Sequence, residues 1–140
     1  MLQLTPLDAA VPVFQQLDAE VSPVVLVNLF QVAQPDIPAL LAAWEADANW
    51  MKQQPGYIST QLHRGIGGST VFLNYAVWES VAHFRAAFSH PQFKAALAHY
   101  PLIGGGLTAF VLSPDGGESV CGSVARPAAP NAVRRKRFRP

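Results

Sequence analysis

Residues 57–78 read YISTQLHRGIGGSTVFLNYAVW, and no other segment of the chain is as informative about the fold. Tyr57–Arg64 alternates between apolar and polar side chains, whereas Thr70–Trp78 is mostly β-branched or aromatic, so both are predicted to be strands. The glycine-rich segment 65–69 predicts a tight turn that joins them into a hairpin. A phosphate-binding loop is the weaker interpretation, because no Lys-Ser or Lys-Thr pair follows and a strand comes next instead of a helix.

Before this hairpin, the chain predicts one strand and one long helix. Val24–Phe30 is a continuous apolar run apart from Asn28, as expected for a strand buried on both faces. Proline and aspartate at positions 35–38 are typical of the first turn of a helix. The apolar face of this helix is predicted from residues at helical spacing, namely Ile37, Leu41, Trp44, Ala48 and Met51.

After the hairpin, two short helical segments and a last strand are predicted. Ser80 is the expected N-cap of the first helix, a second helical segment follows from residue 90, and residues 107–112 form the strand. The order strand, helix, strand, strand, helix, strand predicts an α+β fold of the ferredoxin-like type, a split βαβ arrangement with an antiparallel sheet. Helices would cover one face of this sheet, and two bare faces packed together would form a dimeric α+β barrel.

The composition describes one domain with little charge. The 140 residues match the size of one ordinary domain, and 50% of them are hydrophobic, enough for a packed core. Only 14% are charged, against roughly 25% in a typical domain. So little charge predicts that a second copy of the chain covers part of the surface, which makes a homodimer the expected assembly.

The sequence also indicates where in the cell the protein is expected. No apolar run approaches the ~20 residues that span a bilayer. The N-terminal stretch has no basic residue before its apolar positions and includes Asp8, unlike a secretory signal peptide. Cys121 is the single cysteine, so neither an intramolecular disulfide nor a Cys-rich zinc site is expected. We therefore expect a cytoplasmic protein with no membrane partner.

Composition divides the chain into three parts. Residues 1–22 are expected to be an N-terminal extension lying on the domain, 23–113 the domain itself, and 114–140 a disordered basic tail. Residues 1–113 hold four Lys or Arg against seven Asp or Glu, so this body is not expected to bind nucleic acid. The run Arg134–Arg139 could bind nucleic acid or anionic lipid, although a solvated terminus is the commoner explanation.

The four histidines do not follow the spacing of metal ligands. His63, His83, His90 and His99 form no His-x-x-x-His pair and no Glu-x-x-His motif, so no metal site is expected. His63 lies on a predicted strand, where it could face a cavity and accept a proton near pH 7. The other three lie on short helices, where positions facing solvent are common.

Two asparagines interrupt strands that are otherwise apolar. Asn28 and Asn74 are each flanked by apolar or aromatic residues, and a buried amide costs a few kcal/mol unless it is hydrogen-bonded. Strand alternation places Phe72, Asn74 and Trp78 on one face, so an amide and an indole N–H would lie together in an apolar wall. The two interpretations, a ligand site or structural amides bonded to backbone, stay equally open at this point.

The segments Gln54–Tyr57 and Val71–Ser80 resemble the antibiotic biosynthesis monooxygenase family. The resemblance rests on the Pro-Gly-aromatic sequence after the helix, on Leu-His-Arg at the end of the first hairpin strand, and on the Asn-Tyr-Ala-x-Trp-Glu-Ser sequence that begins at Asn74. It covers about residues 22–113 and implies a ferredoxin-like dimer whose subunits each hold a pocket between sheet and helices.

In the polyketide branch of this family, an anthrone-like aromatic compound is oxidised by O₂ to a quinone without metal, flavin or haem, so the resemblance implies no cofactor. Triplet O₂ reacts poorly with closed-shell molecules, but an electron-rich phenolate or enolate can supply one electron to it. The protein then has to stabilise the oxyanion and hold the reacting carbon near O₂. Carried over to this chain, the resemblance implies that Asn28, Asn74 and Trp78 are the catalytic polar groups.

The residues expected to contact the substrate are His63, Phe72, Phe84 and Lys94. Two of them depart from the polyketide branch, because Phe84 stands where that branch has a tyrosine and Lys94 where it has an arginine. The position of the iron-ligating histidine in the haem-degrading branch is Leu97, which cannot bind iron, so haem degradation is the less expected activity.

The sequence therefore predicts a cofactor-independent monooxygenase that oxidises an aromatic polyketide or a quinol with O₂. The alternative is a non-catalytic, dimeric small-molecule-binding protein of the same fold. The missing hydroxyl at Phe84 favours the binding protein, whereas the combination of Asn28, Asn74 and Trp78 favours the enzyme.

Overall fold

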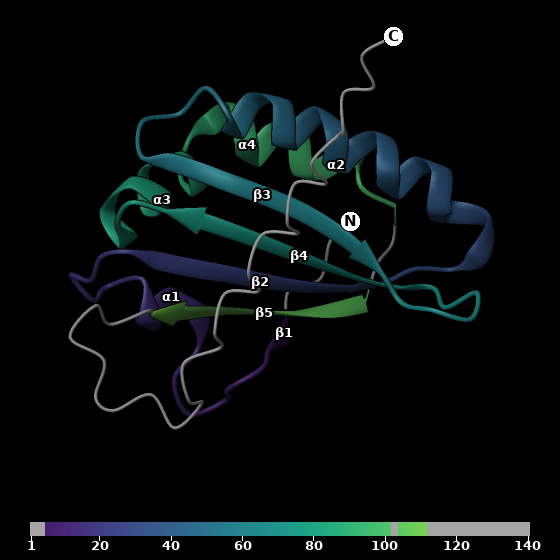
Figure 1. Cartoon of the computed structure of the whole chain (residues 1–140), viewed down its shortest axis with the longest axis horizontal. Helices are drawn as coiled ribbons and strands as arrows, with labels where there is room; N and C mark the ends of the chain where they lie inside the picture. Colours follow the sequence, from purple (N-terminus) through teal and green to yellow (C-terminus); the bar gives the residue numbers. More distant parts are fainter. Residues whose placement is uncertain (1–4, 102–103, 112–140) are drawn as a thin grey trace, which may run out of the picture.

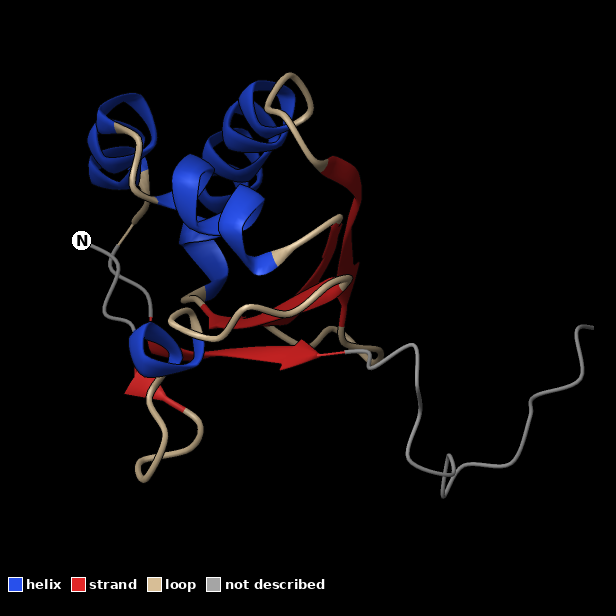
Figure 2. Cartoon of the chain, turned by 90° about the vertical axis from the view of Figure 1, so that its left-hand side faces the viewer, coloured by secondary structure: helices blue, strands red, loops and turns tan. Residues whose placement is uncertain are grey.

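The computed structural model describes residues 5–101 and 104–111, in which helices pack on one face of a five-stranded sheet (Figure 1, Figure 2). The strands are β1 (Thr5–Pro6), β2 (Val24–Gln31), β3 (Tyr57–Arg64), β4 (Val71–Trp78) and β5 (Gly104–Val111). The α-helices are α1 (Val13–Gln16), α2 (Ile37–Met51), α3 (Val81–Phe88) and α4 (Pro91–Ala96). Short 3-10 helices, η1 and η2, cover Gln34–Asp36 and Leu97–His99.

The strand order is β1-β5-β2-β4-β3. β2 lies between β4 and β5 and is antiparallel to both, and β3 is antiparallel to β4. Because β4 separates β2 from β3, the two strands that α2 connects, the sheet has the split βαβ arrangement. The predicted α+β, ferredoxin-like fold with an antiparallel sheet is therefore confirmed for the single subunit.

The hairpin of β3 and β4 follows the predicted local rules. Gly67 and Gly68 adopt φ values of 67° and 78° in the turn, a conformation that only glycine adopts at no steric cost. On β4 the side chains alternate as predicted, with Phe72, Asn74 and Trp78 buried on the face that meets the helices. The opposite face of β4 carries the exposed positions Val71 and Tyr75, so this part of the sheet has one covered and one open side.

Helix α2 buries most of the predicted stripe, with Ile37 and Ala48 buried as expected. Leu40 is 0% exposed, whereas Leu41, which was expected in the buried face, is 42% exposed, so that prediction was wrong. The buried stripe also contains Asp47, one turn before Met51. Residues three or four positions apart lie on the same helix face, so Leu40, Ala43 and Asp47 share the buried face with Ile37 and Ala48, and Leu40 takes the place expected for Leu41.

The segment before β2 contributes to the core. Val13 and Leu17, in and directly after α1, are both 4% exposed and pack with Val24, Trp78 and Phe84. The chain there is tied down by Arg85, whose Nη1 donates to the Leu17 carbonyl oxygen at 2.7 Å. β1 extends the sheet by pairing in parallel with β5.

Two further predictions concern membrane-spanning segments and the basic tail. Within residues 5–101 and 104–111, no helix is long and apolar enough to cross a membrane. The predicted basic tail, residues 114–140, lies outside the described residues.

Replacing Gly56 with alanine is expected to destabilise the protein. Gly56 turns the chain from α2 into β3 with φ of 81°, and a Cβ atom at this position would overlap the ring of His83. A left-handed backbone alone costs an L-residue about 1–2 kcal/mol. The ring cannot move freely, since its Nδ1 lies 2.7 Å from the Ser80 Oγ.

Gly67→Ala is the matched control, to be compared by urea unfolding. Gly67 has a similar φ of 67°, but no atom lies within 4 Å of an added Cβ, so this variant carries the backbone strain alone. We expect Gly56→Ala to lose more free energy of unfolding than Gly67→Ala. Equal losses would mean that the His83 ring moves aside without cost.

Candidate functional site

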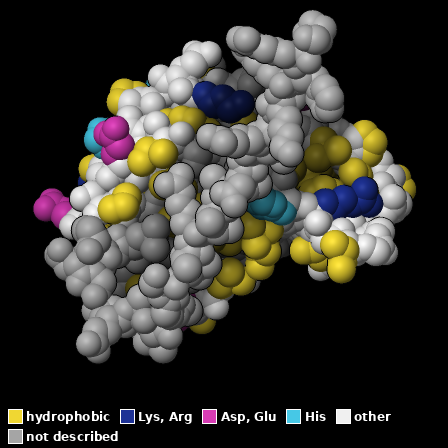
Figure 3. Space-filling model, viewed as in Figure 1, with side chains coloured by type: hydrophobic (Ala, Val, Ile, Leu, Met, Phe, Trp, Pro, Cys, Tyr) yellow, Lys and Arg dark blue, Asp and Glu magenta, His cyan; other side chains and the backbone are white. Residues whose placement is uncertain are grey.

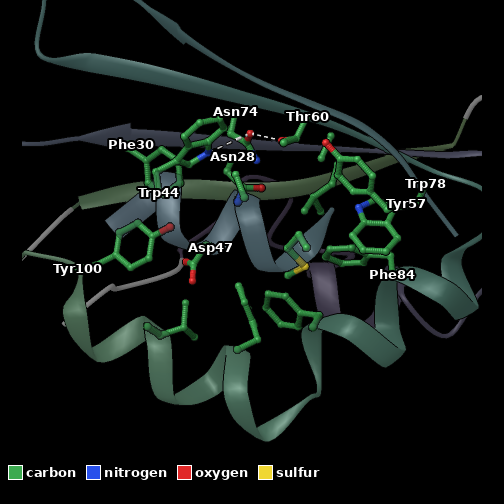
Figure 4. Close-up of a pocket in the computed structure, with 17 residues that line it drawn as sticks. Asn28, Phe30, Trp44, Asp47, Tyr57, Thr60, Asn74, Trp78, Phe84 and Tyr100 are labelled. Atoms are coloured by element: carbon green, nitrogen blue, oxygen red, sulfur yellow. Dashed lines mark hydrogen bonds between the residues drawn. The ribbon is translucent and has the colours of Figure 1, made fainter. Parts of the chain in front are cut away.

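A cavity between the inner face of the sheet and helices α2, α3 and α4 is the candidate site (Figure 4). About 70 Å³ of it is open to the centre of a water molecule, within about 670 Å³ of empty space that includes the open mouth. Most of the wall is apolar or aromatic, and it contains two amides, one carboxyl and a few hydroxyls.

The two predicted asparagines lie side by side on neighbouring strands of the sheet. Asn28 on β2 and Asn74 on β4 are direct cross-strand partners, and both line the cavity. Asn74 is 8% exposed, and the Oδ1 of Asn28 is buried with no hydrogen-bond partner among the described residues. A buried polar atom without a partner costs about 1–3 kcal/mol, so this oxygen is a site where a ligand donor would be stabilising.

The amide of Asn74 is held in one orientation by two donors. The Trp44 indole Nε1 donates to Asn74 Oδ1 at 3.2 Å, and the Thr60 hydroxyl donates to the same oxygen at 2.8 Å (Figure 4). Because an indole N–H can only donate, the atom it meets must be the amide oxygen. The NH₂ group of Asn74 therefore points away from Trp44 and Thr60, and it can donate to a bound ligand.

A β-bulge brings Thr60 into this network. The pairing of β3 with β4 shifts between Tyr57 and Ser59, so Ile58 is an additional residue. Side chains alternate along a regular strand, and residues 57 and 60 would point to opposite faces. With the bulge, both Tyr57 and Thr60 line the cavity, while Ile58 is 52% exposed.

Aromatic rings gather at one end of the cavity. Trp78 packs edge-on against Tyr57, with 5.6 Å between ring centroids, and against Phe84, at 5.7 Å. Figure 4 shows these three rings together, on the far side of the asparagines from Tyr100. Burial raises the pKa of Tyr57, so its hydroxyl stays a neutral donor. This end of the cavity suits the faces and edges of a flat aromatic ligand.

Four of the seven predicted site residues line the cavity, namely Asn28, Asn74, Trp78 and Phe84. Phe72 is 2% exposed but packs in the neighbouring core with Phe30 and Leu40. His63 is exposed, because Thr60 and Leu62 point inward and strand alternation then turns residue 63 outward. Lys94 is exposed on α4. The structure therefore does not bring these three together with the asparagines.

Sequence reasoning missed the carboxyl of Asp47. This residue is 7% exposed, lines the cavity from α2, and has a buried Oδ2 without a partner among the described residues. The hydroxyl of Tyr100 lies beside its carboxyl (Figure 4). Burial raises the pKa of Asp47, although the Tyr100 hydroxyl and the nearby His99 oppose the rise. The signal was present in the sequence, because Asp47 lies three residues after Trp44 on a face otherwise predicted as apolar.

The chemistry of the site is therefore that of neutral donors and one acid in an apolar space. Among the described residues, no three His, Cys, Asp or Glu side chains come close enough to hold a metal ion. Burial and the Asp47 carboxyl raise the pKa of Tyr100, so its hydroxyl remains protonated. Such a site can bind an aromatic ligand, donate to an oxyanion, and accept a proton.

Comparison with known proteins identifies one family that matches this chain. The model of the antibiotic biosynthesis monooxygenase family matches residues 23–99. No curated protein is similar enough in sequence to count as a match. A candidate monooxygenase from Shewanella loihica is 34% identical, with a TM-score of 0.56 over 68% of this chain and 97% of its own.

Two further solved structures have the same fold. SnoaB from Streptomyces nogalater, a cofactor-independent oxygenase, is 23% identical, with a TM-score of 0.61 over 66% of this chain and 95% of its own. A candidate antibiotic biosynthesis monooxygenase from Caulobacter crescentus is 18% identical, with a TM-score of 0.62 over 66% of this chain and 92% of its own.

Proposed function

The chain belongs to the antibiotic biosynthesis monooxygenase family, and we propose that it oxidises an anthrone-like polyketide or a quinol with O₂ to a quinone, without a cofactor. The observation that most supports this function is the pair of amides inside an apolar cavity. Asn28 offers an oxygen that has no partner within the described residues, and Asn74 offers an NH₂ group whose direction is set by Trp44 and Thr60. The likeness to SnoaB, a cofactor-independent oxygenase, adds support.

The arrangement suits a substrate that supplies its own electrons. A phenol or enol that loses its proton becomes an electron-rich oxyanion, which can pass one electron to O₂ and then form a carbon–oxygen bond with it. The Asn74 NH₂ group would stabilise the oxyanion, and an apolar wall favours dissolved O₂ over water near the reacting carbon. The rings of Tyr57, Trp78 and Phe84 would hold the aromatic skeleton.

Oxygen uptake by the purified chain tests this function. The probes are 1,8-dihydroxyanthrone and a hydroquinone, each with a metal chelator, without added flavin, and corrected for uptake without protein. Turnover that persists under chelator is the expected result. Saturable binding of the anthrone without turnover would instead identify a small-molecule-binding protein, and activity abolished by chelator would overturn the cofactor-independent mechanism.

We further propose that two subunits pack their open sheet faces together into a dimeric barrel. Three apolar side chains on β3 and β4, Ile58, Val71 and Tyr75, are 52%, 38% and 39% exposed. Hydrophobic side chains are visible at the surface over the strands in Figure 3. Covering such side chains with a second copy removes apolar area from water, at roughly 25 cal/mol per Å².

A double variant, Val71→Glu with Tyr75→Glu, is expected to be monomeric. The two carboxylates would have to be buried without partners in the proposed interface, and burial of an unpaired charge is strongly unfavourable. Light scattering at micromolar concentration measures the assembly. Ile66→Glu is the control, since Ile66 is 95% exposed in the hairpin turn, and should leave the dimer intact. An unmodified chain that is already monomeric would contradict the proposal.

A further inference from the structure

We propose that Asp47 is the general base of this oxidation and that Tyr100 positions its carboxyl; the inference rests on the function proposed for the same cavity. The carboxyl reaches the cavity from α2, opposite the sheet that carries Asn28 and Asn74. Its Oδ2 is buried without a partner among the described residues, as is the Oδ1 of Asn28. Figure 4 shows Asp47 beside Tyr100, with both directed into the same cavity as the asparagines.

The burial of Asp47 has no structural explanation in the described chain. A buried carboxylate is ordinarily paired with a cation or held by several donors. Asp47 instead has one hydroxyl beside it, that of Tyr100, and one oxygen that meets no partner in the described part of the chain. An acceptor left open on the wall of a ligand cavity is the arrangement that a general base needs, because it must meet a proton that the substrate brings.

Asp47 also lies near the surface. Besides the cavity, it is among the residues that line a shallow surface hollow between α2 and the segment formed by α4 and η2, together with Ala43, Ala96 and His99. Of the titratable groups on the elements packed around it, those that act on Asp47 are Tyr100, through its hydroxyl, and His99, through its charge.

The reaction balances with this single base. Asp47 removes the hydroxyl proton of the enol, and the enolate gives one electron to O₂; the resulting pair then joins through a new carbon–oxygen bond. Protonated Asp47 returns its proton to the terminal peroxide oxygen. The carboxylate next removes the hydrogen from the same carbon, the C=O bond forms as the O–O bond breaks, and the departing hydroxide takes that proton. Overall, a CH₂ group and O₂ become C=O and water, and the carboxylate is regenerated.

The first experiment compares Asp47→Asn with Glu45→Gln in oxygen uptake with 1,8-dihydroxyanthrone. Glu45 lies on the same helix but is exposed, so its variant controls for loss of one negative charge. General bases contribute about 10²–10⁴-fold to rate. We expect kcat of Asp47→Asn to fall at least tenfold, and the decline of wild-type activity at low pH to disappear. A smaller fall, or a low-pH decline that persists, would overturn the assignment.

The second experiment tests the positioning role of Tyr100. Its hydroxyl lowers the pKa of Asp47, so Tyr100→Phe should raise that pKa and move the low-pH decline of activity to higher pH. The ring still stacks on Phe30, at 6.2 Å between centroids, so the variant is expected to fold. Tyr75→Phe, at a position 39% exposed, is the control and should not move the decline. An unmoved decline in Tyr100→Phe would exclude this role.

Stability measurements separate a base from a structural carboxyl. The raised pKa of Asp47 means that the folded state binds its proton more tightly than the unfolded chain, so its ionisation costs stability as pH rises through that pKa. Asp47→Asn should therefore unfold at the same or a higher urea concentration than wild type at neutral pH. A loss of stability in Asp47→Asn would assign the residue to the fold instead. Absence of turnover in the wild type itself would reject the proposed function, which is a different result.

Discussion

Replacing Asn74 with alanine is expected to lower kcat/KM for oxygen-dependent oxidation by about 10²–10³-fold, which corresponds to ~2.7–4 kcal/mol for one donor to a developing oxyanion. The reason is the fixed direction of the Asn74 amide, whose oxygen is occupied by the Trp44 indole and the Thr60 hydroxyl. A donor that is already oriented needs no reorganisation when the oxyanion forms. Initial rates of oxygen uptake with 1,8-dihydroxyanthrone measure the effect.

Thr60→Val separates the amide itself from its support. Valine keeps the shape of threonine and removes the 2.8 Å hydrogen bond to Asn74 Oδ1, while Trp44 still holds the same oxygen. We expect a loss of less than about tenfold in this variant, because one net hydrogen bond is worth about 0.5–1.5 kcal/mol. A folded Asn74→Ala variant with nearly wild-type kcat/KM would show that the amide does not contact the reacting oxygen.

Trp78→Ala is expected to reduce the free energy of unfolding by about 3–5 kcal/mol, the cost typical of removing a buried Phe or Trp side chain. Trp78 is 1% exposed, belongs to the main core cluster, and contacts both Tyr57 and Phe84. Such a loss is a large part of the 5–15 kcal/mol that stabilises a typical domain. Urea unfolding measures it, and Ile66→Ala, at an exposed turn position, should change stability by no more than about 0.5 kcal/mol.

Trp78→Phe is the variant that separates catalysis from packing at this position. Phenylalanine keeps an aromatic ring against Tyr57 and Phe84 and removes the indole N–H. If that N–H donates to the oxyanion, the rate should fall toward about 10²-fold, the lower end for one lost donor, since Asn74 remains. A wild-type rate in folded Trp78→Phe would leave Trp78 as a wall of the cavity and would not affect the role of Asn74.

The main elements of the fold were predictable because each has a local signal. Proline and aspartate precede α2, Ser80 accepts from the His83 backbone N–H at the start of α3, and paired glycines form the hairpin turn. The stripe of α2 that faces the sheet was not predictable in detail. Leu40 and Leu41 are equally apolar, and the packing of the helix on the sheet decides which one is buried.

The site was predictable only where strand alternation alone decides the direction of a side chain. Asn74 and Trp78 share a face of β4, and the direct pairing of Asn28 with Asn74 follows from the register of two regular strands. His63 could not be placed, because the bulge at Tyr57–Ser59 changes which residues of β3 face inward. A bulge depends on pairing with the neighbouring strand, so the sequence of β3 alone does not reveal it.

The bulge has a consequence for how the ligand preference of this cavity can diverge during evolution. Adding one residue to β4 opposite Ile58 would give Ile58 a partner and restore regular alternation in β3, so that Tyr57 and Thr60 could no longer both point inward. If Thr60 turned outward, Asn74 would lose one of its two donors without any substitution in the cavity wall. A change in chain length by a single residue therefore acts on this site as strongly as replacement of a lining side chain, and it offers a short route from one bound compound to another.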